Sequence, residues 1–114
     1  MKIAKPELDD LIDMIDLERI RVVMKALDWN WAGKEEVPTI MELIRAIDSL
    51  YASAYQNVVN QYEQGGRGCS VASGGFEVEV SLDKGVKKDN IIYPFVDLRF
   101  GFSACNRMDL DMIN

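Results

Sequence analysis

A run of small and aromatic residues near the middle of the chain is the first candidate for chemistry. It reads Ser73-Gly74-Gly75-Phe76, and an alternating, strand-like pattern follows it. Two glycines leave the backbone bare, and a phenylalanine ring beside a bare backbone can hold a flat ligand such as a nucleobase. The same residues are typical of a tight turn that enters a sheet. Both interpretations stay open at this point.

Residues suited to catalysis are hard to assemble from this sequence. It has no histidine, so the usual base near neutral pH is missing. It also shows no nucleophile elbow and no phosphate-binding loop. Glu77 and Glu79 could act together as an acid and a base in catalysis. However, the alternation of any half-exposed strand also produces such a pair of carboxylates. We therefore predict a protein that is not an enzyme and needs no cofactor.

The two cysteines, Cys69 and Cys105, lie far apart in the sequence. Nothing around them resembles the framework of a secreted disulfide protein, so free thiols are favoured over a disulfide. Without histidine, a zinc site would have to rest on carboxylates. We predict no metal.

Groups suited to binding are more numerous. Aromatic rings could stack on a base, arginine forks could hold a phosphate, and asparagine amides could read base or ribose edges. We expect ligand contacts from Trp29, Trp31, Gly74, Gly75, Phe76, Asn90, Arg99 and Arg107, with Asn30, Arg67, Tyr93 and Asn106 as further members of the set. Each is weak evidence alone, because a glycine pair usually forms a turn and a strand arginine usually forms a surface ion pair.

Charge and length narrow the class of protein. The 13 bases and 19 acids give a net charge of −6, and the bases are not clustered, so binding to DNA or RNA polymers is not expected. A small anionic ligand needs only one or two arginines. The 114 residues predict one ligand-binding domain, residues 1–114, with no membrane-spanning run. No signal peptide is recognisable, so we expect a cytoplasmic protein.

The elements that must position these groups begin with helices. Pro6 can open a first helix with an apolar stripe opposite a row of aspartates, and Asp16 can cap a second turn that continues over 17–28. The pattern fits either one bent helix or two. Trp29 and Trp31 alternate and cannot share a helix face, so they either pin a loop or stack on a ligand.

A long helix over about 39–63 is the clearest element. Thr39 and Glu42 form a capping box at its start, and Gly65-Gly66 is typical of a helix end. Such a helix would be roughly 35 Å long, whereas a compact domain of this size has a radius near 13 Å. We therefore expect part of its apolar stripe to be buried against another copy, which predicts a homo-oligomer.

Period-two patterns follow the long helix and predict a small antiparallel sheet over about 68–104. The pattern predicts a short strand or a loop over residues 67–72. It predicts a strand with one solvent-exposed face over 76–82 and a long strand over 91–102. The charged residues 84–90 between them are expected to form the connection. Pro94 belongs at an edge or a bulge. The tail 106–114 either docks as a final turn or stays loose. The fold class is therefore α+β, with the helices first.

Three runs taken together resemble a phage family. They are Ala26-Leu27-Asp28-Trp29-Asn30-Trp31, then Val37-Pro38-Thr39-Ile40 with Leu43 opening the long helix, then Ser73-Gly74-Gly75-Phe76. The chain is similar here to the first family of Thoeris anti-defence proteins, over roughly residues 22–102.

The resemblance implies a sponge that binds and sequesters the glyco-cyclic ADP-ribose signal of bacterial TIR-domain immune sensors without cleaving it. It also implies cyclic di- or trinucleotides as further ligands, and a dimer or a dimer-based hexamer with pockets where protomers meet. The aromatic contact of the family matches Phe76, and the loop before the long helix supplies Trp29 and Trp31. A pocket arginine falls on Arg99 or Arg107 and a pocket asparagine on Asn90, although the second strand departs from the family pattern.

Two other classes stay open. The net charge of −6 and the aspartate-rich first helix fit an acidic protein-interaction module that inhibits a host protein, for instance by mimicking nucleic acid. A structural phage protein whose long helix serves oligomerisation is the third possibility.

Overall fold

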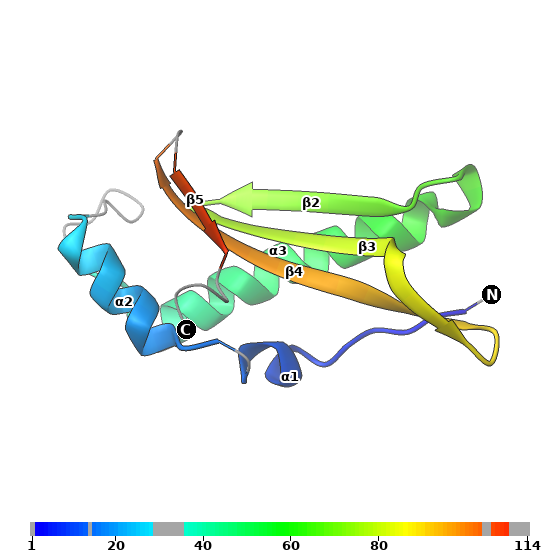
Figure 1. Cartoon of the computed structure of the whole chain (residues 1–114), viewed down its shortest axis with the longest axis horizontal. Helices are drawn as coiled ribbons and strands as arrows, with labels where there is room; N and C mark the ends of the chain where they lie inside the picture. The colour runs from blue at the N-terminus through cyan, green and yellow to red at the C-terminus, as the bar shows by residue number, and fades with distance from the viewer. Residues whose placement is uncertain (1, 14, 29–35, 104–105, 110–114) are drawn as a thin grey trace.

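One long helix packed across a mixed sheet defines the architecture (Figure 1). The computed structural model describes residues 2–13, 15–28, 36–103 and 106–109, with side chains described up to Phe100. The expected α+β class is confirmed. The helices do not all precede the sheet, because the strand β1 (Lys2–Ile3) comes first in the chain.

The N-terminal region contains two separate helices, α1 (Leu8–Ile12) and α2 (Leu17–Ala26). Asp16 separates them, since its carboxylate accepts a hydrogen bond of 3.0 Å from the backbone N–H of Arg19 and caps α2. The predicted cap is therefore confirmed, and the question of one bent helix or two is answered in favour of two. Only α2 contributes buried side chains to the core.

The long helix α3 (Ile40–Gln61) begins at the predicted capping box. The backbone N–H of Glu42 donates to Thr39 Oγ1 at 3.1 Å, and that of Thr39 donates to Glu42 Oε1 at 3.2 Å. A short 3-10 turn, η1 (Tyr62–Gln64), follows the helix and ends at Gly65 in the left-handed region with φ 90°. Glycine adopts this conformation without steric cost, so the predicted glycine end is also confirmed.

Much of the apolar stripe of α3 is buried within the same chain, although Val59 is exposed. Its buried residues are Leu43, Ile47, Leu50, Tyr51, Ala54 and Val58. The molecule is elongated, with extents of 46 × 25 × 22 Å, so the sheet can accompany the helix along its length. The expectation of a second copy assumed a compact sphere, which these extents do not support, and oligomerisation stays a prediction. Helix length therefore gives no reason to invoke a second copy.

The sheet has the strand order β1-β4-β3-β2, with β5 also paired to β4. Its long members are β3 (Phe76–Lys88) and β4 (Ile91–Ser103), and β2 (Gly68–Ser73) forms one edge. Residues 67–72 are therefore mostly strand rather than loop. The sheet is mixed instead of purely antiparallel, because β1 pairs parallel to the start of β4. The described part of the tail, residues 106–109, forms a further antiparallel strand, β5 (Asn106–Asp109), rather than a final turn.

The β3–β4 connection is shorter than the charge pattern suggested. β3 continues to Lys88, and the turn is only Asp89-Asn90, with φ 53° and 65°. The predicted connection over 84–90 was wrong because a bulge between Ser81 and Val86 shifts the register without ending the pairing. Pro94 lies opposite this bulge, between the pairs Tyr93–Val86 and Phe95–Ser81, which confirms its expected position.

The two faces of the sheet have different environments. One face packs on α3 and buries the alternate residues Phe76, Val78, Val80 and Phe100. The other face carries Glu77, Glu79, Asp97 and Arg99 at the intervening positions. Among the described residues, no helix is long and apolar enough to cross a membrane.

Candidate functional site

The glycine pair expected to approach a ligand forms the β2–β3 turn. Gly74 and Gly75 have φ values of 62° and 92°, and Ser73 pairs with Phe76 across the turn. Two consecutive positive φ values are typical of the two-residue hairpin turn whose twist matches the strands. The turn interpretation is therefore confirmed, and a close approach by a ligand stays a prediction.

Phe76 lies in the core rather than on the surface. Its side chain is 2% exposed, and its ring packs against that of Phe100 with centroids 4.5 Å apart. The ring was expected to lie free beside a bare backbone, and that placement was wrong. The physical reason is the alternation of β3, which puts Phe76 on the same face as Val78 and Val80, under α3.

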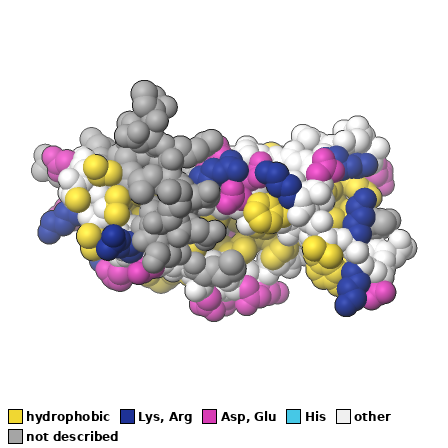
Figure 2. All heavy atoms as spheres, viewed as in Figure 1, with side chains coloured by type: hydrophobic (Ala, Val, Ile, Leu, Met, Phe, Trp, Pro, Cys, Tyr) yellow, Lys and Arg dark blue, Asp and Glu magenta, His cyan; other side chains and the backbone are white. Residues whose placement is uncertain are grey.

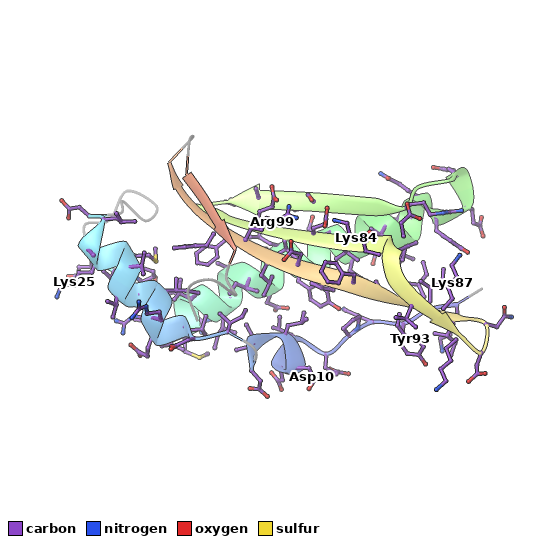
Figure 3. The ribbon with its side chains drawn as sticks, viewed as in Figure 1. Asp10, Lys25, Lys84, Lys87, Tyr93 and Arg99 are labelled. Carbon is purple, nitrogen blue, oxygen red and sulfur yellow. The ribbon has the colours of Figure 1, made fainter. Side chains whose placement is uncertain are left out.

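Arg99 is held by carboxylates of the open face (Figure 3). Its guanidinium lies 3.0 Å from Glu77, 2.8 Å from Asp97 and 3.8 Å from Glu79. Burial alone would lower the pKa of Arg99, but its hydrogen bond to Glu77 and the surrounding negative charges outweigh burial and raise that pKa. A phosphate at this place would meet all these carboxylates, so Arg99 is a poor anion site in this arrangement.

The remaining predicted residues that the structure describes are divided between the two ends of the sheet. Arg107 lies on β5 opposite Gly101 of β4, which puts its backbone at the same end of the sheet as the glycine turn, since Phe100 pairs with Phe76. Asn90 occupies the turn at the opposite end of the β3–β4 hairpin, roughly 40 Å from Phe76 at the usual rise per strand residue. Trp29 and Trp31 lie outside the described residues. The structure thus brings Gly74, Gly75, Phe76, Arg99 and the backbone of Arg107 to one end of the sheet and leaves Asn90 at the other.

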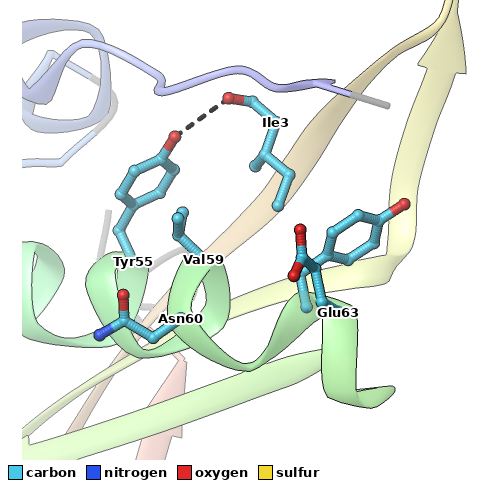
Figure 4. Close-up of a pocket in the computed structure, with 6 residues that line it drawn as sticks. Ile3, Tyr55, Val59, Asn60 and Glu63 are labelled. Carbon is cyan, nitrogen blue, oxygen red and sulfur yellow. Dashed lines mark hydrogen bonds between the residues drawn. The ribbon is translucent and has the colours of Figure 1, made fainter.

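A pocket at a different place contains the kinds of groups that the sequence predicted. It has a volume of about 320 Å³ and lies between β1 and the end of α3 (Figure 4). Its lining residues are Ile3, Tyr55, Val59, Asn60, Tyr62 and Glu63. This volume is at the low end of the range of small-molecule clefts.

The two pocket tyrosines are held by different contacts. The Tyr55 hydroxyl donates a hydrogen bond of 3.1 Å to the carbonyl of Ile3, and burial raises the pKa of this tyrosine. The ammonium group of Lys5 lies 5.5 Å from the centre of the Tyr55 ring. The Arg67 guanidinium lies 5.2 Å from the centre of the Tyr62 ring. Each ring therefore has a cation beside it, within the distance of a cation–π contact.

The pocket offers groups for most parts of a nucleotide. A tyrosine ring can stack on a base, Asn60 and Glu63 can bond to base edges or ribose hydroxyls, and the neighbouring cations Lys5 and Arg67 can meet phosphate. The helical spacing of the tyrosines was visible in the sequence. The docking of β1 against them was not, because Ile3 and Tyr55 are 52 positions apart.

Other reactive groups are few in the part of the chain that the structure describes. Cys69 is a free thiol, as predicted, and Cys105 lies outside the described residues. Within the described ranges no group of three or more potential metal ligands occurs.

The comparisons with known proteins do not identify a family. No protein-family model matches the chain, and neither the curated proteins nor the solved structures gave a significant match. The resemblance to Thoeris anti-defence proteins therefore stays a prediction from the three sequence runs.

Proposed function

We propose that this protein binds and sequesters a cyclic nucleotide immune signal of the glyco-cyclic ADP-ribose type without cleaving it. Cyclic di- or trinucleotides are further candidate ligands. It would act in the cytosol of a host bacterium and keep the TIR-triggered effector inactive. The Tyr55–Tyr62 pocket is the observation that carries ligand binding, because it combines rings, an amide, a carboxylate and neighbouring cations. The sequence resemblance supplies the identity of the signal.

Each group in the pocket has a role in this proposal. The Tyr62 ring stacks on the base, while Asn60 and Glu63 take hydrogen bonds to base edges or ribose hydroxyls. Lys5 and Arg67 leave their tyrosine rings to bind the phosphates, which are the stronger partners for a cation. None of these residues forms a nucleophile–base pair, so the ligand is held and released intact.

Calorimetric titration with glyco-cyclic ADP-ribose tests ligand binding directly. Sequestration at low signal concentration needs a dissociation constant of nanomolar order, about −12 kcal/mol. Heating the complex should then release intact signal. Heat no larger than the buffer blank contradicts the proposed ligand, and recovery of a cleaved product indicates an enzyme instead.

Matched tyrosine variants test the location of the site. Tyr62→Ala removes a ring that lines the pocket, whereas Tyr93→Ala removes a ring that is 45% exposed on the β3–β4 hairpin. We expect the first to weaken binding by about tenfold or more, from the loss of one stacked base, and the second to leave it unchanged. Equal effects would place the ligand elsewhere. Phe76→Ala is unsuitable for this purpose, because a buried ring also supports the fold.

An acidic protein-interaction module is the second candidate function. The exposed carboxylates Asp9, Asp10 and Asp13 on and next to α1 favour it. This function requires salt-dependent binding to a host protein and its loss on charge reversal at Asp9 or Asp10. The sponge function requires that the same reversals leave signal binding unchanged.

A further inference from the structure

The open face of the sheet carries a pair of exposed aromatic rings. Tyr93 and Phe95 are 45% and 43% exposed, and residues two apart on a strand point to the same side, so both rings lie on one face of β4. Val86 pairs with Tyr93 across the hairpin and is 64% exposed. Of the aromatic side chains that the structure describes, these two alone are exposed. They form an apolar surface on the side of the sheet opposite α3.

The surface beside the rings is low and open. On this face β2 contributes only small residues, which pair with Ser81, Glu79 and Glu77 of β3; they are Gly68, Ser70 and Ala72. In Figure 1 the strands lie in front of α3, so Figure 2 looks onto this face and shows hydrophobic side chains there beside charged ones. An extended ligand can therefore lie flat across the strands and contact both rings.

The charges next to Phe95 favour a cationic ligand. The ammonium group of Lys84 already holds such a position, 6.0 Å from the centre of the Phe95 ring and 3.1 Å from Glu79 Oε1 (Figure 3). From Phe95 toward the glycine turn the face carries three carboxylates and two cations, which are Glu77, Glu79 and Asp97 with Lys84 and Arg99. A phosphate would meet a net negative charge here, whereas a guanidinium can lie over the ring and beside a carboxylate.

The other end of the aromatic pair has a different charge. Lys88 lies two residues beyond Val86 on β3 and is exposed, and the exposed acids nearby are Asp83 on the bulge and Asp89 in the turn. A cation over Tyr93 would therefore meet a lysine as well as acids. This difference directs the cationic part of a ligand toward Glu79.

The spacing along β4 fits a polyproline segment. Tyr93, Phe95 and Asp97 follow one another at intervals of roughly 6.6 Å, so a point midway between the two rings is roughly 10 Å from Asp97. A polyproline helix rises about 3.1 Å per residue with three residues per turn, so residues three apart share one edge and lie roughly 9 Å apart. A proline between the rings thus places the residue three positions away beside the carboxylates. Such segments are preformed and lose little conformational freedom when they bind to aromatic surfaces.

We propose that this face binds a proline-rich segment of a partner protein in which an arginine lies three residues from a proline. The prolines contact Tyr93 and Phe95, and the arginine binds beside Glu79 and Asp97. Lys84 competes for this position, since its ammonium must leave the Phe95 ring when the arginine arrives. The proposal goes beyond the nucleotide function, because none of these residues lines the pocket.

Calorimetric titration with designed peptides tests the chemistry of the partner. The probe is an acetylated, amidated peptide of the sequence Pro-Pro-Pro-Arg repeated twice, and it should bind with a dissociation constant below about 1 mM. Citrulline in place of arginine keeps the shape but removes the charge, and it should weaken binding by about fivefold or more. Heat no larger than the buffer blank for the arginine peptide, or equal affinity for the citrulline peptide, overturns the proposal.

Variants of the protein test the location of this surface. Tyr93→Ala should weaken binding of the arginine peptide by about fivefold or more. Lys84→Met keeps the aliphatic stem but removes the competing ammonium, so it should strengthen binding by about two- to fivefold. Met41→Ala, at a 56% exposed position of α3, and Tyr62→Ala, in the nucleotide pocket, should leave peptide binding unchanged.

The direction of each change decides the outcome. The proposal is wrong if Lys84→Met fails to strengthen binding, or if Tyr93→Ala and Met41→Ala weaken it equally. Circular dichroism of every variant checks that the fold is kept. Loss of signal binding in Tyr62→Ala with unchanged peptide binding would separate the two sites, so either function can fail without the other.

Discussion

The two faces of the sheet are stabilised by different interactions. On the covered face, Phe76, Val78, Val80 and Phe100 are each 2% exposed or less, so burial of apolar surface is the main contribution. On the open face, Arg99 lies among Glu77, Glu79 and Asp97, which are partly buried. Such a network adds little stability against a well-packed apolar alternative, and we expect its main effect to be on specificity, by disfavouring wrong arrangements.

The open face matches the strand register that the apolar alternation sets. Glu77 pairs directly with Arg99 across β3 and β4. A slip by one residue would turn the acids of β3 toward α3 and bring Phe76 and Val78 to solvent. The comparison teaches that the covered face contributes the apolar burial, and we expect the charged face to disfavour other registers.

The largest expected effect is on the covered face. Phe76→Ala should lower the free energy of unfolding by about 3–5 kcal/mol, because it leaves a cavity beside Phe100. Urea denaturation measures this loss, with Tyr93→Ala as an exposed control that should stay within about 0.5 kcal/mol. A cost of less than about 1 kcal/mol for Phe76→Ala would mean that the ring is not in the core and would reopen its stacking role.

The bulge of β3 is the next test, because the regular alternation of the two faces is interrupted there. A Cβ atom added to Gly85 would clash with the backbone carbonyl oxygen of Tyr93. Gly85→Ala should therefore cost about 1–3 kcal/mol through displacement of β4. At Gly68 the closest atom would be at 3.3 Å, so Gly68→Ala should cost less. Equal denaturation midpoints for the two variants would contradict this placement of the bulge.

A substitution on the open face should lower the free energy of unfolding less than a substitution on the covered face. Arg99→Met keeps the aliphatic stem but leaves Glu77 and Asp97 without this cation, which should cost about 1–3 kcal/mol. Arg45→Met, at an exposed position of α3, should stay within about 0.5 kcal/mol. If the Arg99 variant is as stable as wild type, the network does not select the register.

The smallest expected change in the free energy of unfolding comes from a buried polar group, the Tyr51 hydroxyl. This change depends on pH. Burial, with the nearby Tyr55 and Glu7, raises the pKa of Tyr51 to about 12 from 10.0. The unfolded state therefore loses its proton first, so this contribution to stability is complete below pH 10 and is lost as pH rises toward 12.

Tyr51→Phe removes both the titration and the hydrogen bond to Pro6. It should cost about 1 kcal/mol near neutral pH and flatten the decline in stability above pH 10. Denaturation curves at several pH values, each compared with wild type, measure the difference. A decline of the same size in both proteins would assign the alkaline sensitivity to other groups.

Local patterns predicted much of the fold. The capping box of Thr39 and Glu42, the cap at Asp16 and the glycine end at Gly65 depend on neighbours within a few residues, and all were found where expected. The bulge near Gly85 and the parallel β1 were missed. Both depend on contacts between distant segments, which no local pattern records.

The candidate site shows the same limit. The alternation of Phe76 with Glu77 already assigned this ring to the apolar face, and the binding interpretation set that pattern aside. The pocket could not be predicted, because it exists only where Ile3 docks against Tyr55. Residue types predicted the kind of chemistry, whereas the long-range fold decides which residues supply it.

The parallel pairing of β1 with β4 has a consequence for the order of folding. Lys2 pairs with Ile91, so this contact closes nearly the whole chain, whereas β2, β3 and β4 form from neighbouring segments. Loop closure makes such a contact late to form, and a strand of only Lys2–Ile3 is early to fray. The side of the pocket that Ile3 lines is thus assembled late, and amide exchange at Ala4, whose N–H donates to Ile92, should slow when a ligand occupies the pocket.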